Sequence, residues 1–488
     1  MSAEFLPGGV EYLRLLPEIV LTVGGVLVMI LEGMAGEGRR RNLGGVALVA
    51  ISAAIWAAVA AHRHPGTAFR DMLVVDGFAT FFRVLVLAVG LLTVLCSVSY
   101  LRREESDSGE FHALLLFSLV GQCLMASANE LIMIFIGLEI SSIASYVLAG
   151  YLRDDRRNNE AALKYFLLGS FATAFLLYGV AWIYGLTGST NLSRIREVLS
   201  RPETGISPTL VGVSAALIFV GLAFKVSAAP FHVWAPDVYQ GAPAPVSAFL
   251  SAGPKAAAFA ILLRVSMTAF APLGGRWEQI LWASSFLTMI VGNFAALHQT
   301  NIKRLLAYSS IAHAGYVLVA VTARTEIGVA AAMFYLAAYA FMNVGAFAVV
   351  THFSRRGERY VNVNDLAGLG ARQPATAALF SIFLLSLIGV PLTGGFFGKF
   401  YIFKAAFDSG LIGLAILGLL NSAVAAYYYL RVLVVMYFHE PGEAANTVAS
   451  PAPGIRVALW ASALATVALG VYPSMVLEFA GRWADLGK

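Results

Sequence analysis

Apolar residues follow one another along this chain in blocks of roughly 20, separated by short polar stretches. A helix of about 20 apolar residues is long enough to cross roughly 30 Å of hydrocarbon. We therefore expect an all-α polytopic membrane protein with about 14 transmembrane helices, at 12–33, 42–61, 77–100, 112–128, 131–151, 161–186, 209–233, 243–269, 279–297, 304–322, 328–352, 375–402, 409–437 and 455–479.

Two of these predicted helices contain helix-breaking residues near a lysine. The seventh, 209–233, contains Lys225 and Pro230, and the twelfth, 375–402, contains the stretch GVPLTGGFFGK that ends at Lys399. A broken membrane helix is tolerated where the freed backbone groups line a cavity or find partners. We expect both helices to be broken.

The sequence also contains an internal repeat. EISSIASYVL in the fifth helix corresponds to AYSSIAHAGYVL in the tenth, and AALKYFLLGSF to AAMFYLAAYAF, about 170 residues apart. Helices 4–8 and 9–13 therefore form two five-helix repeats, and their odd number inverts the second in the membrane, as in transporters. The division expected is an N-terminal three-helix segment (1–111), two repeats (112–270 and 271–437) and a C-terminal helix (438–488). Chance similarity of apolar segments is the alternative.

Composition agrees with this pattern, since 59% of the 488 residues are hydrophobic and only 12% are charged. The odd-numbered loops carry more Lys and Arg than the even-numbered ones, which places the odd loops in the cytoplasm and both termini outside. The odd-loop cations are Arg39, Arg40, Arg41, Arg102, Arg103, Arg153, Arg156, Arg157, Lys303, Arg304, Arg355, Arg356, Arg359, Arg372 and Arg456.

Several kinds of site are not indicated by the sequence. The two cysteines, Cys96 and Cys123, lie in apolar segments and form no metal-binding pattern. There is no GxGxxG after a plausible strand, no GxxxxGK[ST] and no His/Asp/Glu set with metal-ligand spacing. We expect no cofactor and no metal in this chain.

Ionisable residues inside the predicted helices are the candidate functional groups. Lys225 lies in an apolar run, and Glu139 in the fifth helix has at least seven uncharged residues on each side. Charges at membrane depth are costly and usually serve proton or ion pathways. We expect Glu139 to pair with Lys225 in one state and to release it in another, although a protonated, packed glutamate is the simpler alternative.

Two further lysines fit the same interpretation. Lys255 follows Pro254 in the eighth helix, and Lys399 follows a glycine-rich stretch in the twelfth. A buried lysine can exchange protons near neutral pH, which an exposed lysine does poorly. The alternative for each lysine is a side chain that reaches the membrane surface.

Three accessory positions remain open to two interpretations. His232 and His313 are candidate proton relays or hydrogen-bonded structural groups. Lys164 is either functional or one member of an i,i+4 surface pair with Glu160. A glutamate, several lysines and one or two histidines, separated along the membrane, indicate a proton path rather than a hydrolytic site.

Four stretches carry a family resemblance: GLEISSIASYVLAGY, GLAFKVSAAPFHVWAPDVYQGAPAPVSAFL, KRLLAYSSIAHAGY and LTGGFFGKFY. They closely resemble the antiporter-like membrane subunits of respiratory complex I, the NADH-quinone oxidoreductase, and best match its subunit N branch. The resemblance implies a proton-translocating subunit of this enzyme, in which each repeat is a proton half-channel. By it, Glu139, Lys225, Lys255 and Lys399 translocate protons, with Lys164, His232 and His313 as accessory residues.

The resemblance also implies partners and a location. NAD, FMN, iron–sulfur clusters and quinone are expected on partner subunits, with sister antiporter-like and small membrane-arm subunits beside this chain in a bacterial inner membrane. Two alternatives stay open. One is a subunit of a multisubunit Na+/H+ antiporter, and the other is a mainly structural membrane-arm subunit.

Overall fold

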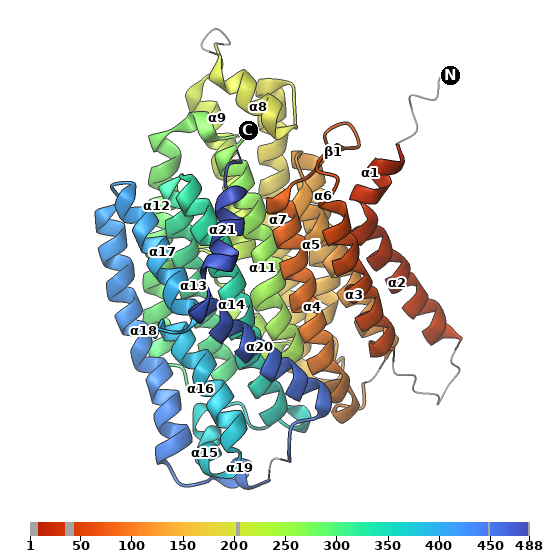
Figure 1. Cartoon of the computed structure of the whole chain (residues 1–488), viewed down its shortest axis with the longest axis vertical. Helices are drawn as coiled ribbons and strands as arrows, with labels where there is room; N and C mark the ends of the chain where they lie inside the picture. Colours follow the sequence, from red (N-terminus) through yellow and green to blue (C-terminus); the bar gives the residue numbers. More distant parts are fainter. Residues whose placement is uncertain (1–7, 35–42, 107, 202–204, 448, 487–488) are drawn as a thin grey trace.

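The structure is a computed structural model that describes residues 8–34, 43–106, 108–201, 205–447 and 449–486. Its helices run mostly along one axis and form an elongated bundle (Figure 1). The first part of the chain contains α1 (Gly9–Arg14), α2 (Leu16–Gly33), α3 (Gly44–Ala61), α4 (Gly77–Arg103), α5 (Gly109–Ser127), α6 (Leu131–Ala149), α7 (Arg156–Thr187), α8 (Leu192–Ser200), α9 (Pro208–Val226), α10 (Trp234–Gly241) and α11 (Ala244–Met267).

The second part begins with η3 (Ala271–Leu273), a short 3-10 helix. It continues with α12 (Gly275–Leu297), α13 (Ile302–Ala323), α14 (Glu326–Phe353), η4 (Arg356–Glu358), η5 (Val363–Leu366), α15 (Leu369–Arg372), α16 (Pro374–Ile388), α17 (Gly394–Asp408), α18 (Ile412–Phe438), α19 (Glu443–Thr447), α20 (Pro453–Val471) and α21 (Ser474–Arg482). The strands β1 (Gly66–Ala68) and β2 (Leu73–Val75) form an antiparallel hairpin between α3 and α4.

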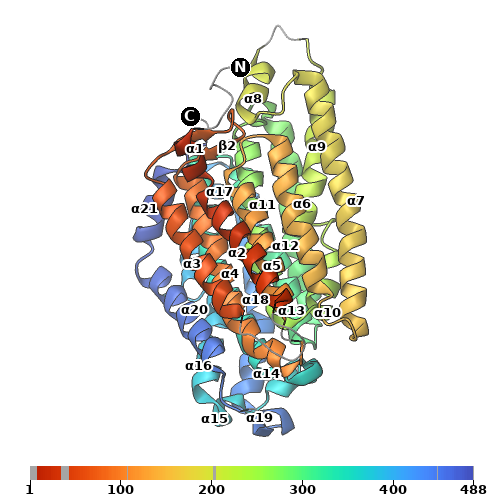
Figure 2. The same cartoon turned by 90° about the vertical axis from the view of Figure 1, so that its right-hand side faces the viewer.

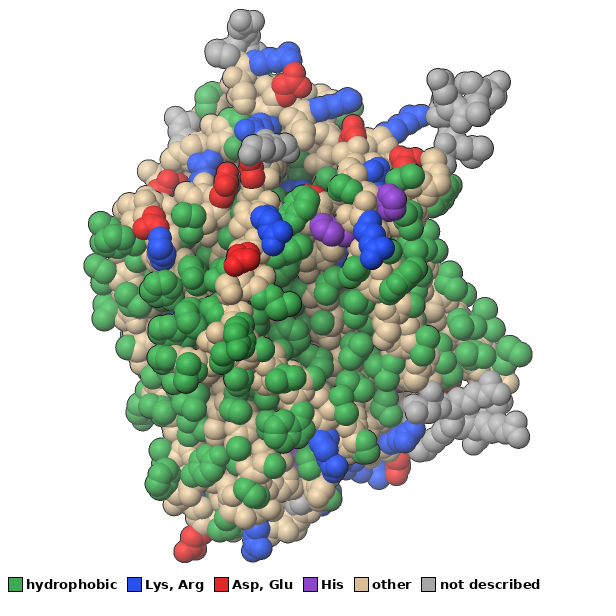
Figure 3. All heavy atoms as spheres, viewed as in Figure 1, with side chains coloured by type: hydrophobic (Ala, Val, Ile, Leu, Met, Phe, Trp, Pro, Cys, Tyr) green, Lys and Arg blue, Asp and Glu red, His purple; other side chains and the backbone are tan. Residues whose placement is uncertain are grey.

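The prediction of an all-α polytopic membrane protein is confirmed. Within the described part of the chain, 13 helices are long and apolar enough to cross a membrane. On the face shown in Figure 3, hydrophobic side chains form a band across the middle of the molecule, and charged side chains gather toward its two ends. Such a band is the surface that a bilayer requires. The predicted twelfth helix is the one missing from these 13, because it consists of the two shorter helices α16 and α17.

Both predicted interruptions are present. The seventh predicted helix ends at Val226, where Ser227 adopts a left-handed conformation, and a turn containing Pro230 leads into α10. Trp234 donates a hydrogen bond of 2.9 Å to the backbone carbonyl of Phe224, so an aromatic side chain satisfies one carbonyl at this helix end. The predicted range 209–233 therefore extended too far, as periodicity does not locate a helix end.

Polar residues fix the starts of several helices. Asp76 caps α4, Glu130 caps α6 and Asn301 caps α13, because a side-chain oxygen of each accepts a hydrogen bond from a backbone N–H in the first turn. These caps lie in the short connections between spans. They hold the membrane helices in register with the loops at either end of the bundle.

The connections divide between two ends of the bundle. One end is called here the even-loop end. At this end the hairpin forms a backbone β-bridge with Ala128 through Leu73, and Glu130 forms another with Asn191. Leu486 also lies there, because its carbonyl accepts a hydrogen bond from Thr268, and α1 lies near the hairpin (Figure 1). The described chain thus begins and ends at the same end, as an even number of crossings requires. Residues 1–7 and 487–488, the termini themselves, lie outside the described residues.

At the opposite end, called here the odd-loop end, the loops after α4, α6 and α14 meet. Gly357 donates to a carboxylate oxygen of Glu104 at 2.9 Å, and Arg157 donates to the carbonyl of Gly357 at the same distance. The helices α15 and α19 also lie at this end (Figure 2). The predicted cations Arg39, Arg40 and Arg41 lie outside the described residues.

The centre of the bundle is built from α11, α13 and α14, whose residues are almost all buried. The membrane-facing helices α7, α18 and α20 each keep an exposed apolar side. A helix buried on every side can place a polar group where neither lipid nor bulk water reaches it. The candidate site lies on and around these central helices.

Candidate functional site

Lys225 lies in the last turn of α9, just before the interruption, and is 4% exposed. Its ammonium donates hydrogen bonds to the hydroxyls of Ser142 at 2.8 Å and Tyr165 at 3.2 Å. It also lies 5.4 Å from the centre of the Tyr165 ring, a distance at which a cation interacts with an aromatic face. Lys225 is therefore held by neutral groups from α6 and α7.

Glu139 lies on α6, three residues before Ser142, which places it about 4.5 Å along the helix axis from that serine. Its carboxylate acts on Lys225 through charge, but the two form no ion pair among those found in the described residues. One carboxylate oxygen of Glu139 is buried and has no hydrogen-bond partner in the described part of the chain. The geometry thus corresponds to the unpaired of the two expected states.

Lys255 lies in the middle of α11 and is 2% exposed. Its ammonium donates to the hydroxyl of Ser310 at 2.5 Å and to the carbonyl of the same residue at 3.1 Å. Ser310 lies on α13, one of the three central helices. Lys255 is therefore also held by neutral oxygens, from a helix of the other half of the chain.

Lys399 lies in the first half of α17 and is bound by the broken end of α16. Its ammonium donates to the carbonyls of Leu387 at 2.9 Å and Ile388 at 2.8 Å, and to the hydroxyl of Ser422 at 2.8 Å. The last carbonyls of a helix have no partner within it and carry partial negative charge, so they suit a cation. The interruption in the predicted twelfth helix thus provides the binding site of Lys399.

The turn at the end of α16 depends on a glycine. Gly389 has φ +97°, and a Cβ added to it would lie 3.2 Å from Cδ of Lys399. Residues other than glycine rarely adopt such a φ. Glycine therefore both makes the turn and leaves room for the lysine side chain.

His313 lies on α13 near Lys255 and Lys399, since both lysines act on it through charge. One ring nitrogen lies 2.5 Å from the hydroxyl of Tyr335, and the other lies 3.1 Å from the hydroxyl of Tyr429. Tyr429 in turn contacts Ser309. The ring therefore joins a chain of hydroxyls in the neighbourhood of the two lysines.

The two other accessory residues lie apart from this chain. His232 is half-buried in the turn between α9 and α10, and the hydrogen bonds found in the described residues do not join it to a lysine. Lys164 lies at the odd-loop end of α7, where it is 41% exposed and pairs with Glu160 and Asp237, each at 2.7 Å. The expected pair with Glu160 is confirmed, and Asp237 is an added partner.

Asp237 joins three elements at the rim of a cavity of 240 Å³. It lies on α10, accepts a hydrogen bond of 2.7 Å from Lys164 of α7, and accepts one of 2.6 Å from Arg304 of α13. Partial burial by itself would raise the pKa of Asp237, but the hydrogen bonds from the two cations outweigh it and hold the pKa below its ordinary value. Asp237 is thus an anionic link between the two halves.

The family model described as NADH:quinone oxidoreductase/Mrp antiporter, TM, matches residues 128–425. A protein of Solibacter usitatus named NADH-quinone oxidoreductase subunit N 1 is 65% identical over 474 residues, which is 97% of each chain. The chain belongs to the NADH-quinone oxidoreductase subunit N family. The resemblance found in the sequence is confirmed.

Solved structures agree with this family. A chain of respiratory complex I from Thermus thermophilus with bound aureothin is 36% identical, with a TM-score of 0.81, and the match covers 95% of this chain and 99% of that one. A chain of the Mrp complex from Dietzia sp. DQ12-45-1b has a TM-score of 0.82 with 97% of both chains covered, but at 24% identity it is similar in fold alone. All seven predicted site residues lie within the 128–425 match.

Two groups of functional candidates were missed by the sequence analysis. Ser142 and Ser310 were not among the predicted site residues, yet each binds a lysine. Their shared SSIA motif in the two repeats was the signal that pointed to them. Lys303 was counted only as a loop cation, but it is fully buried and pairs with Glu358 at 2.6 Å. The position of Lys303 near the start of a predicted helix did not indicate that its side chain would be buried.

Two buried arginines form ion pairs that join different helices, or a helix and the cap of another. Arg264 binds Asp76 through two hydrogen bonds of 3.0 and 3.1 Å, and Arg83 pairs with Glu18 at 2.7 Å. No group of three or more His, Cys, Asp or Glu suited to a metal ion is found in the part of the chain that the structure describes. The polar groups described at the candidate site are lysine ammonium groups, one carboxylate, an imidazole and hydroxyls.

Proposed function

We propose that this chain is the proton-translocating subunit N of the membrane arm of an NADH-quinone oxidoreductase, with Glu139, Lys225, Lys255 and Lys399 as the residues that carry protons. The observation that carries the proposal is that all three lysines are buried and are bound by neutral oxygens. Without an acidic partner in contact, a buried ammonium is readily discharged when a nearby charge moves.

Glu139 supplies such a charge. Two unit charges 4 Å apart at an effective dielectric of 20 interact by about 4 kcal/mol, and by about half of that at 8 Å. Drawing Glu139 toward Lys225 therefore favours the charged lysine, and withdrawing it favours release of the proton. The released proton passes to Lys255 and, through His313 and its hydroxyl neighbours, to Lys399.

The two repeats, 112–270 and 271–437, act in this proposal as two half-channels, flanked by the segments 1–111 and 438–488. Lys225 belongs to the first and Lys399 to the second, while Lys255 is bound by a serine of the other repeat. Lys164, His232 and His313 serve as accessory residues. Lys164 lines the 240 Å³ cavity at the odd-loop end, from which we expect protons to enter.

The exposed side of α6 supports an assembly with partner subunits. Glu139 is only partly buried and lies beside the exposed side chains of Ile136, Ile143 and Val147. A carboxylate facing lipid is costly, so this surface is expected to be covered by another membrane-arm subunit. The NAD, FMN, iron–sulfur clusters and quinone of the enzyme are proposed to reside on partner chains.

The expected location is a bacterial inner membrane, with the odd-loop end in the cytoplasm and both termini outside. Lys303, Arg304, Arg356 and Arg372 lie at the odd-loop end and support this orientation through the positive-inside rule. A protease accessibility assay on right-side-out and inverted vesicles would test it.

The proposal is tested by purifying the enzyme through a tag on this chain and reconstituting it in liposomes. The expected result is that NADH oxidase and quinone reductase activities copurify with the chain and that NADH drives proton uptake into the liposomes. An assembly with no quinone reductase that exchanges Na+ for H+ would favour the antiporter alternative instead. An active enzyme whose pumping is insensitive to Lys255→Ala would favour a structural role.

A further inference from the structure

A polar cavity of 620 Å³ opens at the odd-loop end and leads to Glu358. Its lining includes Tyr100, Glu104, Asp155, Arg157 and Arg356. Groups of both charges therefore surround a cavity that is large enough to hold water. Glu358 lies at its inner wall, where its side chain is 10% exposed.

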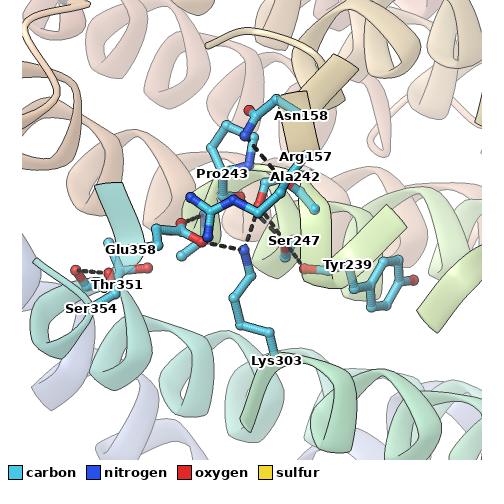
Figure 4. A network of polar contacts seen from close by, with 12 residues as sticks. Arg157, Asn158, Tyr239, Ala242, Pro243, Ser247, Lys303, Thr351, Ser354 and Glu358 are labelled. Atoms are coloured by element: carbon cyan, nitrogen blue, oxygen red, sulfur yellow. Dashed lines mark hydrogen bonds and ion pairs between the residues drawn. The ribbon is translucent and has the colours of Figure 1, made fainter. Parts of the chain in front are cut away.

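Glu358 joins this cavity to a fully buried lysine. One carboxylate oxygen accepts hydrogen bonds from the hydroxyl of Tyr100 at 2.9 Å and from the backbone N–H of Ala244 at 2.7 Å. The other lies 2.6 Å from the ammonium of Lys303, which has no exposed side-chain surface. Figure 4 shows this contact, with the ammonium of Lys303 directed at Glu358 and at the carbonyl of Ala242.

The network continues from Lys303 toward Lys255. Ser247 contacts the carbonyl of Ala242 and donates a hydrogen bond of 2.7 Å to the carbonyl of Tyr239 (Figure 4). The hydroxyl of Tyr239 donates a hydrogen bond of 3.2 Å to the carbonyl of Leu250, which lies on α11 five residues before Lys255. Lys303 and Ser310 are also seven residues apart on α13, so they face the same side, about 10 Å apart along the axis.

We propose that Glu358 is a proton-uptake residue, which takes protons from the odd-loop cavity and delivers them through Lys303 to Lys255. The inference rests on the proposed function. The Glu358 carboxylate takes a proton from cavity water and becomes a neutral acid, which leaves Lys303 without its counter-charge. The Lys303 ammonium then gives a proton, through the intervening hydroxyls and water, to the neutral amine of Lys255. Glu358 finally gives its proton to the neutral amine of Lys303, so one proton has reached Lys255.

This route is distinct from the one through Lys225, because it reaches Lys255 without passing Glu139. It also explains why a lysine is buried at the foot of α13 against a single carboxylate. A merely structural ion pair at this place would clamp α13 to the loop that contains η4. The proton-uptake role and the structural role predict different results when the Glu358 carboxylate is replaced by an amide, which removes the negative charge but keeps the shape of the side chain.

The test is Glu358→Gln in the complete enzyme, reconstituted in liposomes, with proton uptake per NADH measured between pH 6 and 9. The matched control is Glu105→Gln, an exposed acid near the same loop that pairs with Arg356 at 2.7 Å. We expect Glu358→Gln to lower proton uptake per NADH while NADH oxidation persists, and Glu105→Gln to match the wild type. An unchanged ratio over the whole pH range in Glu358→Gln would overturn the proposal.

Two further variants keep the test decisive. If Glu358→Gln fails to assemble, Glu358→Asp keeps an acid at the cavity wall, and the pH profile of proton uptake is expected to shift; an unshifted profile overturns the proposal. Lys255→Ala separates the two claims. Loss of pumping in Lys255→Ala with normal pumping in Glu358→Gln rejects this inference alone, whereas normal pumping in both rejects the proposed function.

Discussion

Ser142 and Ser310 are the second serines of the two SSIA motifs, and each accepts a hydrogen bond from a buried lysine. Lys225 of α9 binds Ser142 of α6 at 2.8 Å, and Lys255 of α11 binds Ser310 of α13 at 2.5 Å. The SSIA motif is therefore used twice for the same contact, and its second use joins α11 to α13.

This relationship gives a paired prediction. Removing a hydrogen bond to a charged group costs about 1.5–3 kcal/mol, so Ser310→Ala should disfavour the charged form of Lys255. We expect proton uptake per NADH to fall in Ser310→Ala, and Ser142→Ala to act in the same way through Lys225, which keeps its second contact with Tyr165. The two effects should be similar, because Lys255 also keeps a second contact, with the backbone carbonyl of Ser310. If both variants take up as many protons per NADH as the wild type, the role given to these serines is contradicted.

The end of α16 gives a prediction about a glycine. Gly389→Ala should destabilise the enzyme, because a left-handed backbone costs about 1–2 kcal/mol for a residue with a Cβ, and the added methyl group also presses on Lys399. Gly188→Ala is the matched control, since Gly188 has φ +70° and nothing within 4 Å of an added Cβ. Both variants should lower the midpoint of thermal inactivation. Only Gly389→Ala should also lower proton uptake, and equal pumping in the two would argue against the Lys399 site.

Asp237 gives a prediction about pH. Its pKa is lower in the folded protein than its ordinary value, so its contribution to stability is present above about pH 4 and is lost as the pH falls through the folded-state value. Asp237→Asn should therefore lower the thermal midpoint by a constant amount from pH 8 to pH 5. The difference in midpoint between the wild type and the variant should disappear only at more acidic pH. If that difference disappears between pH 7 and pH 6, another group is responsible.

The pair of Glu18 and Arg83 gives a prediction about the N-terminal helices. Both side chains are buried, and they join α2 to α4 at 2.7 Å. Removing one partner of a buried pair costs about 3–5 kcal/mol, because an uncompensated charge remains. Glu18→Ala should therefore release α2 and α3 to proteolysis at lower temperature than the wild type. The exposed pair of Arg201 and Glu197 is the control, and Glu197→Ala should have no measurable effect.

The fold class and the lysine positions could be predicted from the sequence for physical reasons. Long apolar segments must be helices in a membrane, and a charge within one of them needs a function. The breaks beside Lys225 and Lys399 were visible as proline and glycine. Neither pattern depends on how the helices pack, so both could be found without the structure.

The partners of these charges could not be predicted, because they depend on packing. Lys255 is bound by a serine 55 residues away, and Lys399 is bound by backbone carbonyls that are free only because α16 ends there. Lys303 lies at a helix start in the sequence, where a cation is normally solvated, and only the tertiary structure buries it against Glu358. Lys225 is bound here by Ser142 and not by Glu139, whose pairing with the lysine was expected in only one of two states.

The central claim is that Lys225, Lys255 and Lys399 carry protons when the enzyme oxidises NADH. Its most direct test is Lys225→Ala in the reconstituted enzyme, with NADH oxidation and proton uptake measured on the same liposomes. The account predicts lower proton uptake in an enzyme that is fully assembled. Normal quinone reductase activity together with normal proton uptake would contradict it.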